Sequence, residues 1–123
     1  MAITEAFAGS KAFSSLTDWS LPHDAAYSSG TVKTDDGVYQ ICIDLSALVY
    51  STSLADAFTL YVYEKVRTGD TKRLCYGATF LGAVYPPIYV LPSLILLNGW
   101  DVRLECNTAA ASRTITWSIR KVA

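Results

Sequence analysis

Four stretches of the chain alternate between apolar and polar residues. Alternation with a period of two places one set of side chains on each face of a β-strand, so each stretch is predicted to be a strand with one buried face and one hydrated face. The stretches are residues 38–45, 58–66, 100–107 and 114–122, and their apolar faces hold Tyr39, Ile41, Ile43 and Leu45; Phe58, Leu60, Val62 and Val66; Trp100, Val102, Leu104 and Cys106; and Ile115, Trp117 and Ile119. Asp101 belongs to a hydrated face. Few segments keep a helical period, and the chain is therefore predicted to be all-β.

Turn-forming residues separate these strands. Residues 68–71 (Thr-Gly-Asp-Thr) lie between two strand-like runs, and Asn98-Gly99 is the strongest two-residue hairpin signal in the chain. Residues 34–37 and 109–112 are predicted loops, and a weaker strand is predicted near residues 12–20. At 123 residues the chain has the length of one domain with its own core. We predict a single antiparallel β-sandwich or jelly-roll-like domain of about seven or eight strands over residues 13–123.

The longest uncharged run covers residues 74–100, without one Asp, Glu, Lys, Arg or His. It is not predicted to span a membrane, because three prolines interrupt it and each costs about 3 kcal/mol inside a helix. We predict instead a strand at 74–81, a Pro-Pro bend, an extended piece at 88–91 and a second apolar segment at 93–97. Residues 94–97 (Leu-Ile-Leu-Leu) do not alternate, so both sides of this segment are expected to avoid water.

This run holds more apolar surface than a two-layered sandwich can bury, because each strand offers the interior only one face. Burial under a loop and burial against a partner are both open; we favour a subunit contact, since large exposed apolar patches are rare on soluble monomers. Tyrosine is enriched at interfaces, although two half-exposed sheet tyrosines explain Tyr61 and Tyr63 equally well. The predicted interface residues are Tyr61, Tyr63, Tyr85, Pro86, Pro87, Ile88, Tyr89 and Leu91.

Charge argues against two classes of partner. The net charge is −1, so the chain lacks the basic excess of a nucleic-acid binder and the polybasic segment of a membrane anchor. Glu5 stands where a signal peptide would carry Lys or Arg, and no secretory signal is expected. Charged residues make up 17% of the chain against about 25% in typical globular domains, which suggests additional surface hidden from water.

Neither a catalytic nor a metal site is predicted. Cys42, Cys75 and Cys106 are odd in number and lack CxxC spacing, so they are expected to be reduced thiols without zinc. Asp35-Asp36 lacks the ligand spacing of a calcium loop. His23 is the sole histidine, lies in a predicted loop without a GxSxG motif nearby, and is expected to face solvent. We therefore predict that the chain is not an enzyme and needs no cofactor.

A small carbohydrate-binding module is an alternative, since such sandwiches stack exposed aromatic rings on sugars. The candidate platforms are Trp19, Trp100 and Trp117. Trp100 and Trp117 share the apolar faces of their strands and are more typical of core residues, which leaves Trp19 as the surface candidate.

Several segments resemble small β proteins encoded by tailed bacteriophages. They are residues 17–22 (TDWSLP), 36–48 (DGVYQICIDLSAL), 61–66 (YVYEKV), 98–102 (NGWDV) and 117–122 (WSIRKV), so the resemblance covers most of residues 17–122. It implies a virion component assembled in the host cytoplasm, and in our preferred version a capsid decoration (cement) protein. A tail, spike or fibre component is the strongest alternative within the same class.

The resemblance also implies the partners, which are the major capsid protein and further copies of the chain, for instance as a trimer. Residues 1–12 are predicted to form an N-terminal arm whose small residues suit an extended path with little structure of its own; a frayed terminus is an equally good interpretation. The arm residues expected to contact the capsid are Ala2, Ile3, Thr4, Glu5, Ala6 and Phe7.

Overall fold

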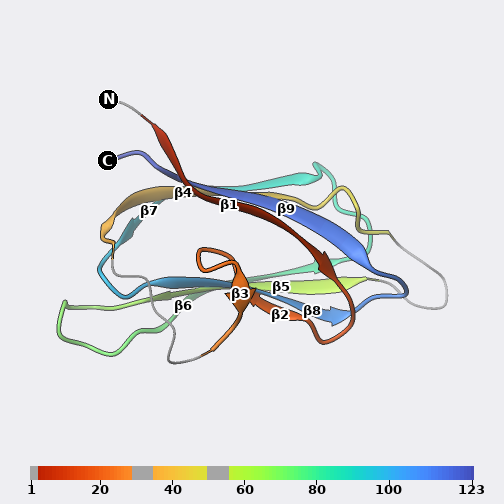
Figure 1. Cartoon of the computed structure of the whole chain (residues 1–123), viewed down its shortest axis with the longest axis horizontal. Helices are drawn as coiled ribbons and strands as arrows, with labels where there is room; N and C mark the ends of the chain where they lie inside the picture. The colour runs from red at the N-terminus through yellow and green to blue at the C-terminus, as the bar shows by residue number, and fades with distance from the viewer. Residues whose placement is uncertain (1–2, 29–34, 50–55) are drawn as a thin grey trace.

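The structure is a computed structural model that describes residues 3–28, 35–49 and 56–123. Two antiparallel sheets pack face to face, as Figure 1 shows from the side. The strands are β1 (Thr4–Phe13), β2 (Asp18–Ser20), β3 (Ala25–Ala26), β4 (Gly37–Asp44), β5 (Ala57–Glu64), β6 (Arg73–Leu81), β7 (Ile88–Leu96), β8 (Asp101–Thr108) and β9 (Arg113–Lys121). One sheet has the order β1-β9-β4-β7 and the other β3-β2-β8-β5-β6. The predicted all-β sandwich is confirmed, with nine strands among the described residues.

The core lies between the two sheets and is built by the predicted alternation. The inward positions of β4, β5, β8 and β9 are fully or almost fully buried. Two buried indoles are held by hydrogen bonds: Trp117 donates its Nε1–H to the carbonyl of Leu21 at 3.1 Å, and Trp100 donates its Nε1–H to the carbonyl of Asp35. Buried indole groups need such acceptors, because an unpaired buried donor is costly.

Three sequence predictions at strand ends are wrong. Val66 does not share the buried face of β5, because the strand ends at Glu64 and Val66 lies exposed in the following turn. Asp101 is fully buried instead of hydrated. The Asn98-Gly99 turn does not close a hairpin: Gly99 has the positive φ of 97° expected of a turn, but β7 and β8 belong to different sheets, so the turn crosses the sandwich.

The uncharged run forms fewer elements than predicted. The two pieces expected at 88–91 and 93–97 are one strand, β7, with Pro92 in its middle. Proline is tolerated there because β7 is an edge strand and its pairing with β4 shifts register beside this residue. Residues 94–97 also alternate after all, because Leu96 is buried and Ile95 is exposed.

The N-terminal segment is a strand of the sandwich. Residues 4–13 pair with β9 along its length, from Thr4 opposite Lys121 to Phe13 opposite Arg113, and Phe7 and Phe13 pack against the core. The prediction of an arm with little structure of its own is therefore wrong for residues 4–12; Met1 and Ala2 lie outside the described residues. Small residues hid this strand, since Gly9 leaves space for the Trp117 ring and Ala8 and Ser10 cover the outer face. The weak strand predicted near 12–20 is instead the end of β1, a turn and β2.

Candidate interaction surface

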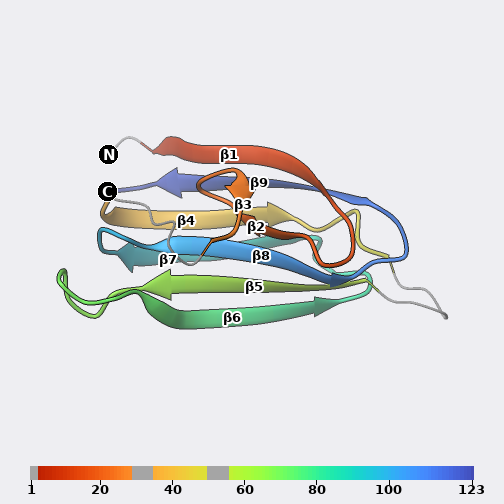
Figure 2. The ribbon, with the colours of Figure 1, turned by 60° about the horizontal axis from the view of Figure 1, so that its bottom comes forward.

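The uncharged run lies along one lateral edge of the sandwich. Its strands β6 and β7 are the outermost strands of the two sheets, and Figure 2 shows β6 at the border opposite β1. The two edges are linked across the layers, because the hydroxyls of Tyr76 and Tyr89 share a hydrogen bond and the rings of Phe80 and Tyr89 meet edge to face with centroids 4.8 Å apart. Burial and this hydrogen bond raise the pKa of Tyr89 well above its ordinary value. The run thus closes one side of the core.

Seven large apolar side chains of the run remain exposed around this edge, and we call them the apolar edge. Their exposed fractions range from 37% to 94% and add to about four whole side chains. At roughly 200 Å² for a large exposed side chain, that is on the order of 800 Å² in total. This area is divided between the β6 side, on the outer face of the five-stranded sheet, and the β7 side, on the outer face of the four-stranded sheet. The members of the apolar edge are Leu74, Tyr76, Leu81, Tyr85, Ile88, Val90 and Ile95.

The predicted interface residues fall into different places. Tyr85 and Ile88 belong to the apolar edge, and Pro86, which follows a cis peptide bond, is exposed beside them. Pro87 and Tyr89 are half-buried, the former accepting a hydrogen bond from the backbone N–H of Leu45 through its carbonyl. Leu91 is a core residue at 9% exposure, so its assignment to an interface is wrong. Its side chain points inward because Leu91 alternates with the exposed Val90 and Pro92 along β7.

Sequence reasoning missed five members of the apolar edge. Leu74, Leu81, Val90 and Ile95 occupy strand positions that point away from the core, and Tyr76 lies at the gap between the sheets. The signal that could have found the first four was their phase. In β7, for example, Val90 and Ile95 alternate with the buried Leu91 and Leu96, once the register shift around Pro92 is taken into account.

Tyr61 and Tyr63 lie on the outer face of the five-stranded sheet, on the strand next to β6. Tyr63 stacks on Tyr27 with centroids 5.7 Å apart, and the Arg103 guanidinium lies 4.7 Å and 4.6 Å from the ring centroids of Tyr27 and Tyr61. A hydrogen bond to Asp18 at 2.7 Å raises the pKa of Arg103, while burial and the contact with Tyr63 raise the pKa of Tyr27 to about 12. These tyrosines are packed against each other and against a cation, and they border the apolar edge, because Tyr63 lies opposite Leu74 in the β5–β6 pair.

A buried polar cluster beneath these tyrosines brings together a serine, a histidine and an aspartate. Ser20 Oγ donates to Asp101 Oδ1 at 2.7 Å and also meets His23 Nδ1 at 2.6 Å, while Lys72 Nζ lies 3.5 Å from Asp101 Oδ2. A catalytic triad needs the serine on Nε2 of the histidine and the aspartate on Nδ1, with an accessible serine. Here Nδ1 faces both groups, and Ser20 is fully buried. The cluster therefore fastens the β2–β3 hairpin to β8.

His23 is correspondingly less exposed than predicted. Its side chain keeps only 17% of its accessible surface because it packs over Ser20 and Asp101. The residues of this cluster come from positions 20, 23, 72 and 101, and no spacing in the sequence connects them.

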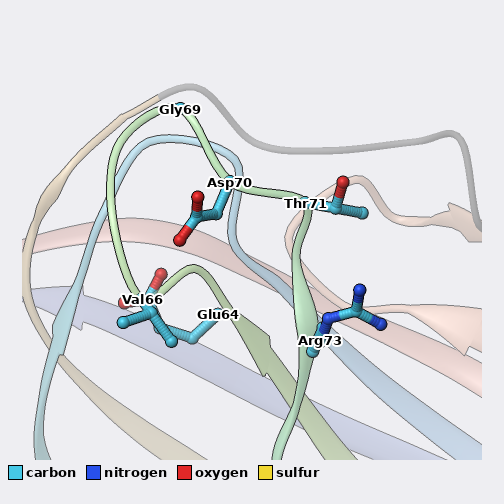
Figure 3. Close-up of a pocket in the computed structure, with 6 residues that line it drawn as sticks. All are labelled: Glu64, Val66, Gly69, Asp70, Thr71 and Arg73. Carbon is cyan, nitrogen blue, oxygen red and sulfur yellow. The ribbon is translucent and has the colours of Figure 1, made fainter.

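Two hollows are lined by described residues outside this cluster. One of about 440 Å³ opens at the β5–β6 hairpin, where Figure 3 shows Asp70 directed into the turn. Its acidic groups are already engaged, since Asp70 pairs with Arg67 and Glu64 accepts backbone N–H bonds from Lys65 and Leu97. They offer no free ligand set.

The second hollow, of about 540 Å³, lies on the outer face of the four-stranded sheet. Small side chains such as Ala8, Ser10 and Cys42 line it, and Ile88 of the apolar edge is part of its lining. It therefore extends the exposed surface of β7 across the sheet.

Metal binding and membrane insertion concern residues 3–28, 35–49 and 56–123. In these ranges no group of three or more His, Cys, Asp or Glu side chains is placed to hold a metal ion. In the same ranges no helix has the length and apolar character to cross a bilayer. Cys42, Cys75 and Cys106 are free thiols, and burial raises the pKa of the fully buried Cys106 to about 11.

Comparison with known proteins gives limited information. No protein-family model and no curated protein matches the chain. Among solved structures, the crystal structure of PirA is similar over 96% of this chain and 89% of the PirA chain, with a TM-score of 0.44 and 8% sequence identity. This similarity is too low to carry an inference about function.

Proposed function

We propose that this chain is a virion structural protein without catalytic activity, and specifically a capsid decoration protein that binds the outside of a tailed-phage head. The observation that carries the proposal is the apolar edge, an exposed and uncharged surface on an otherwise well-buried sandwich. Clusters of exposed apolar side chains are typical of interaction sites on soluble proteins. The chain would occupy the virion after synthesis in the host cytoplasm.

The β7 side of the apolar edge is the proposed contact with the major capsid protein. Ile88, Val90 and Ile95 project from the outer face of this strand, next to the hollow of the four-stranded sheet, and Tyr85 stands at the preceding loop. A protein that binds only the assembled shell shifts the equilibrium toward that shell, and repeated copies add their contributions. Stabilisation of the head therefore requires no chemistry beyond binding.

The carbohydrate-binding alternative has less support. Trp100 and Trp117 are core residues at 0% and 2% exposure, as their strand phase predicted, and cannot stack on a sugar. Trp19 is half-buried, with Lys11 Nζ 4.4 Å from its ring centroid and its Nε1–H bonded to Asp24. Arg103 lies against the outer-face tyrosines Tyr27 and Tyr61. An open aromatic platform is therefore lacking among these described side chains.

A sedimentation assay tests the proposal. Purified protein is mixed with heads of the encoding phage from which the chain has been stripped, and with separated tails, and the bound fraction is measured after pelleting. We expect binding to heads, and at least a tenfold loss of affinity for Ile95→Lys, since one buried large apolar side chain contributes about 1.5–3 kcal/mol. Leu16→Lys is the matched control, because Leu16 is 81% exposed and Ile95 80%, and Leu16 lies outside the apolar edge.

The outcomes separate the alternatives. Failure of the unmodified protein to pellet with heads would overturn the capsid assignment, and pelleting with tails alone would assign it to the tail. Equal binding of Ile95→Lys and Leu16→Lys would remove the β7 side from the contact.

A further inference from the structure

The edges of the two sheets differ in how they are protected against pairing with another strand. Natural sheets block their edges with charged residues, proline, bulges or very short strands. Of the edge strands in the described residues, β1 carries Glu5 and Lys11 and a register shift, β7 carries Pro92 and a register shift, and β3 has two residues. Each of these three edges therefore carries at least one protective feature, and no stretch longer than four residues lacks one.

The edge strand β6 carries such features only at its start, where Arg73 is charged and the pairing with β5 shifts register at Cys75. From Leu74 to Leu81 it contains neither a charged residue nor a proline, and seven of its nine residues are exposed. Its one irregularity lies near its start at Cys75, and residues 76–81 pair with β5 without interruption. It therefore presents six residues of regular strand with an unprotected outer row of backbone N–H and C=O groups.

We propose that a second copy of this chain pairs with β6 in antiparallel orientation, so that the five-stranded sheets of two subunits join into one continuous sheet. This inference deepens the proposed function, because it names the partner at the β6 side of the apolar edge and leaves the β7 side for the capsid. A two-fold axis perpendicular to the sheet would relate the subunits, which gives each strand the same contacts.

The charge pattern favours a second copy as the partner. A two-fold axis brings identical residues together, so a charged edge would repel itself, whereas the uncharged edge from Leu74 to Leu81 meets no such cost. The same lack of charge offers a partner of opposite charge nothing to bind. Antiparallel strands also supply matching donors and acceptors to each other whatever their side chains, so an edge is complementary to its own copy.

The small residues in the middle of β6 mark where the axis would lie. Directly opposed residues of an antiparallel pair point to the same face, so one residue must lie opposite its own copy, with the axis midway between the two copies. Within the regular part of β6 the central candidates are Gly77, Ala78 and Thr79. All three have short side chains, which allows the two backbones to approach.

The native mass tests the pairing. We expect the protein to have twice the 13.4 kDa mass of one chain at micromolar concentration by light scattering coupled to gel filtration. Thr79→Lys adds a charge to the centre of the edge and should yield a folded monomer, with folding checked by circular dichroism. Thr114→Lys is the matched control, because Thr114 is an exposed strand residue on β9 of the other sheet. A monomeric unmodified protein, or a Thr79→Lys variant that stays dimeric, would overturn the proposal.

A cysteine scan tests the register independently. Cysteine is introduced singly at positions 77, 78 and 79 of a Cys42→Ser, Cys75→Ser background, and the protein is oxidised with diamide. The residue nearest the axis faces its own copy at about 4.5–5.5 Å between Cα atoms, within disulfide reach, whereas its neighbours face theirs on a diagonal of about 7–8 Å. We expect one position to form covalent dimers at least tenfold faster than the other two. Equal rates at the three positions, or an absence of dimers at all of them, would refute the pairing.

The two proposals fail in different ways. If Thr79→Lys is monomeric and still pellets with heads, self-pairing is dispensable for attachment and the capsid assignment stands. If the unmodified protein forms the crosslinked dimer but does not bind heads, the pairing stands and the capsid assignment falls.

Discussion

Adding a single methyl group at Gly9 tests whether the N-terminal segment forms the strand β1, packed on Trp117. Gly9 lies opposite Trp117 in the β1–β9 ladder, and a Cβ atom there would come within 2.6 Å of Cζ2 of the indole and 3.0 Å of Cε2. Carbon atoms in contact prefer about 3.5–4.0 Å, so the ring would have to withdraw by about 1 Å. The substitution Gly9→Ala therefore forces either β1 or Trp117 to move.

The expected loss follows from how firmly Trp117 is held. Its ring is 2% exposed and is fixed by the hydrogen bond from Nε1–H to Leu21, so it cannot swing into solvent. Overpacking a core costs about 1–3 kcal/mol, while replacing glycine inside a strand returns about 0.5–1 kcal/mol. We expect a net loss of about 1–2 kcal/mol, which for a domain of this size lowers Tm by roughly 4–10 °C.

Thermal and urea unfolding followed by circular dichroism measure this change at one fixed protein concentration. Gly69→Ala is the control, because nothing lies within 4 Å of a Cβ at Gly69 and the variant should be neutral or slightly stabilised. If Gly9→Ala unfolds within 0.5 kcal/mol of the unmodified protein, a typical limit for a surface change, β1 is not packed on Trp117 and the segment behaves as the arm that the sequence predicted.

Three further predictions concern the core. Asp56 is fully buried; burial works against its ionisation, but hydrogen bonds from Val49 and Arg113 outweigh this and lower its pKa. Asp56→Asn should therefore lower the free energy of unfolding in urea by about 2–3 kcal/mol above pH 4, somewhat less than for a fully buried pair because Arg113 keeps 17% exposure. The difference between the two proteins should shrink as acid protonates Asp56. A difference below about 0.5 kcal/mol, a typical limit for a surface change, would contradict the pairing of Asp56 with Arg113. The pKa of Cys106 is raised to about 11, so between pH 9 and 11 the thiol ionises in the unfolded chain before it ionises in the folded one. Over this range the free energy of unfolding should fall by on the order of 2–3 kcal/mol relative to that of Cys106→Ala. Parallel pH profiles of the two proteins would refute this prediction. Leu91→Lys should unfold the protein by circular dichroism while Ile95→Lys stays folded, and a folded Leu91→Lys would place that residue at the surface.

For β4, β5, β8 and β9, the sequence correctly predicted which face of the strand each apolar core residue occupies, because that depends only on alternation within the strand itself. Tyr39, Leu60 and Leu104 were found because alternation over eight residues leaves one way to hide the apolar face. The assignment of strands to sheets was not accessible in this way, as the Asn98-Gly99 turn shows. The same turn chemistry serves a hairpin and a crossing between layers, and only the packing of the whole chain decides between them.

The sequence predictions also failed for a buried polar residue, Asp101, and for a strand with many small residues, β1. Asp101 looked hydrated because it alternates with the charged Arg103 and Glu105, and its partners Ser20 and Lys72 come from distant segments. β1 carries few large apolar residues, since Gly9 makes room for a ring supplied by β9, so its own pattern was weak. Within the candidate site, the uncharged run indicated a contact surface, but which side chains stay exposed depended on a register shift beside Pro92 that sequence does not mark.

The pairing of β1 with β9 brings the first and last described strands side by side, with Thr4 opposite Lys121, so the start of β1 and the end of β9 lie at the same end of the molecule in Figure 1. A short linker between the ends would turn the pair most distant in sequence into a local hairpin, and the chain could be reopened at the β5–β6 turn. Such a circular permutant would pair β1 with β9 without the entropic cost of closing a loop that spans nearly the whole chain. It should fold faster if β1 pairs with β9 before the rate-limiting step of folding. Cargo fused to either terminus would emerge from that same end of the sandwich.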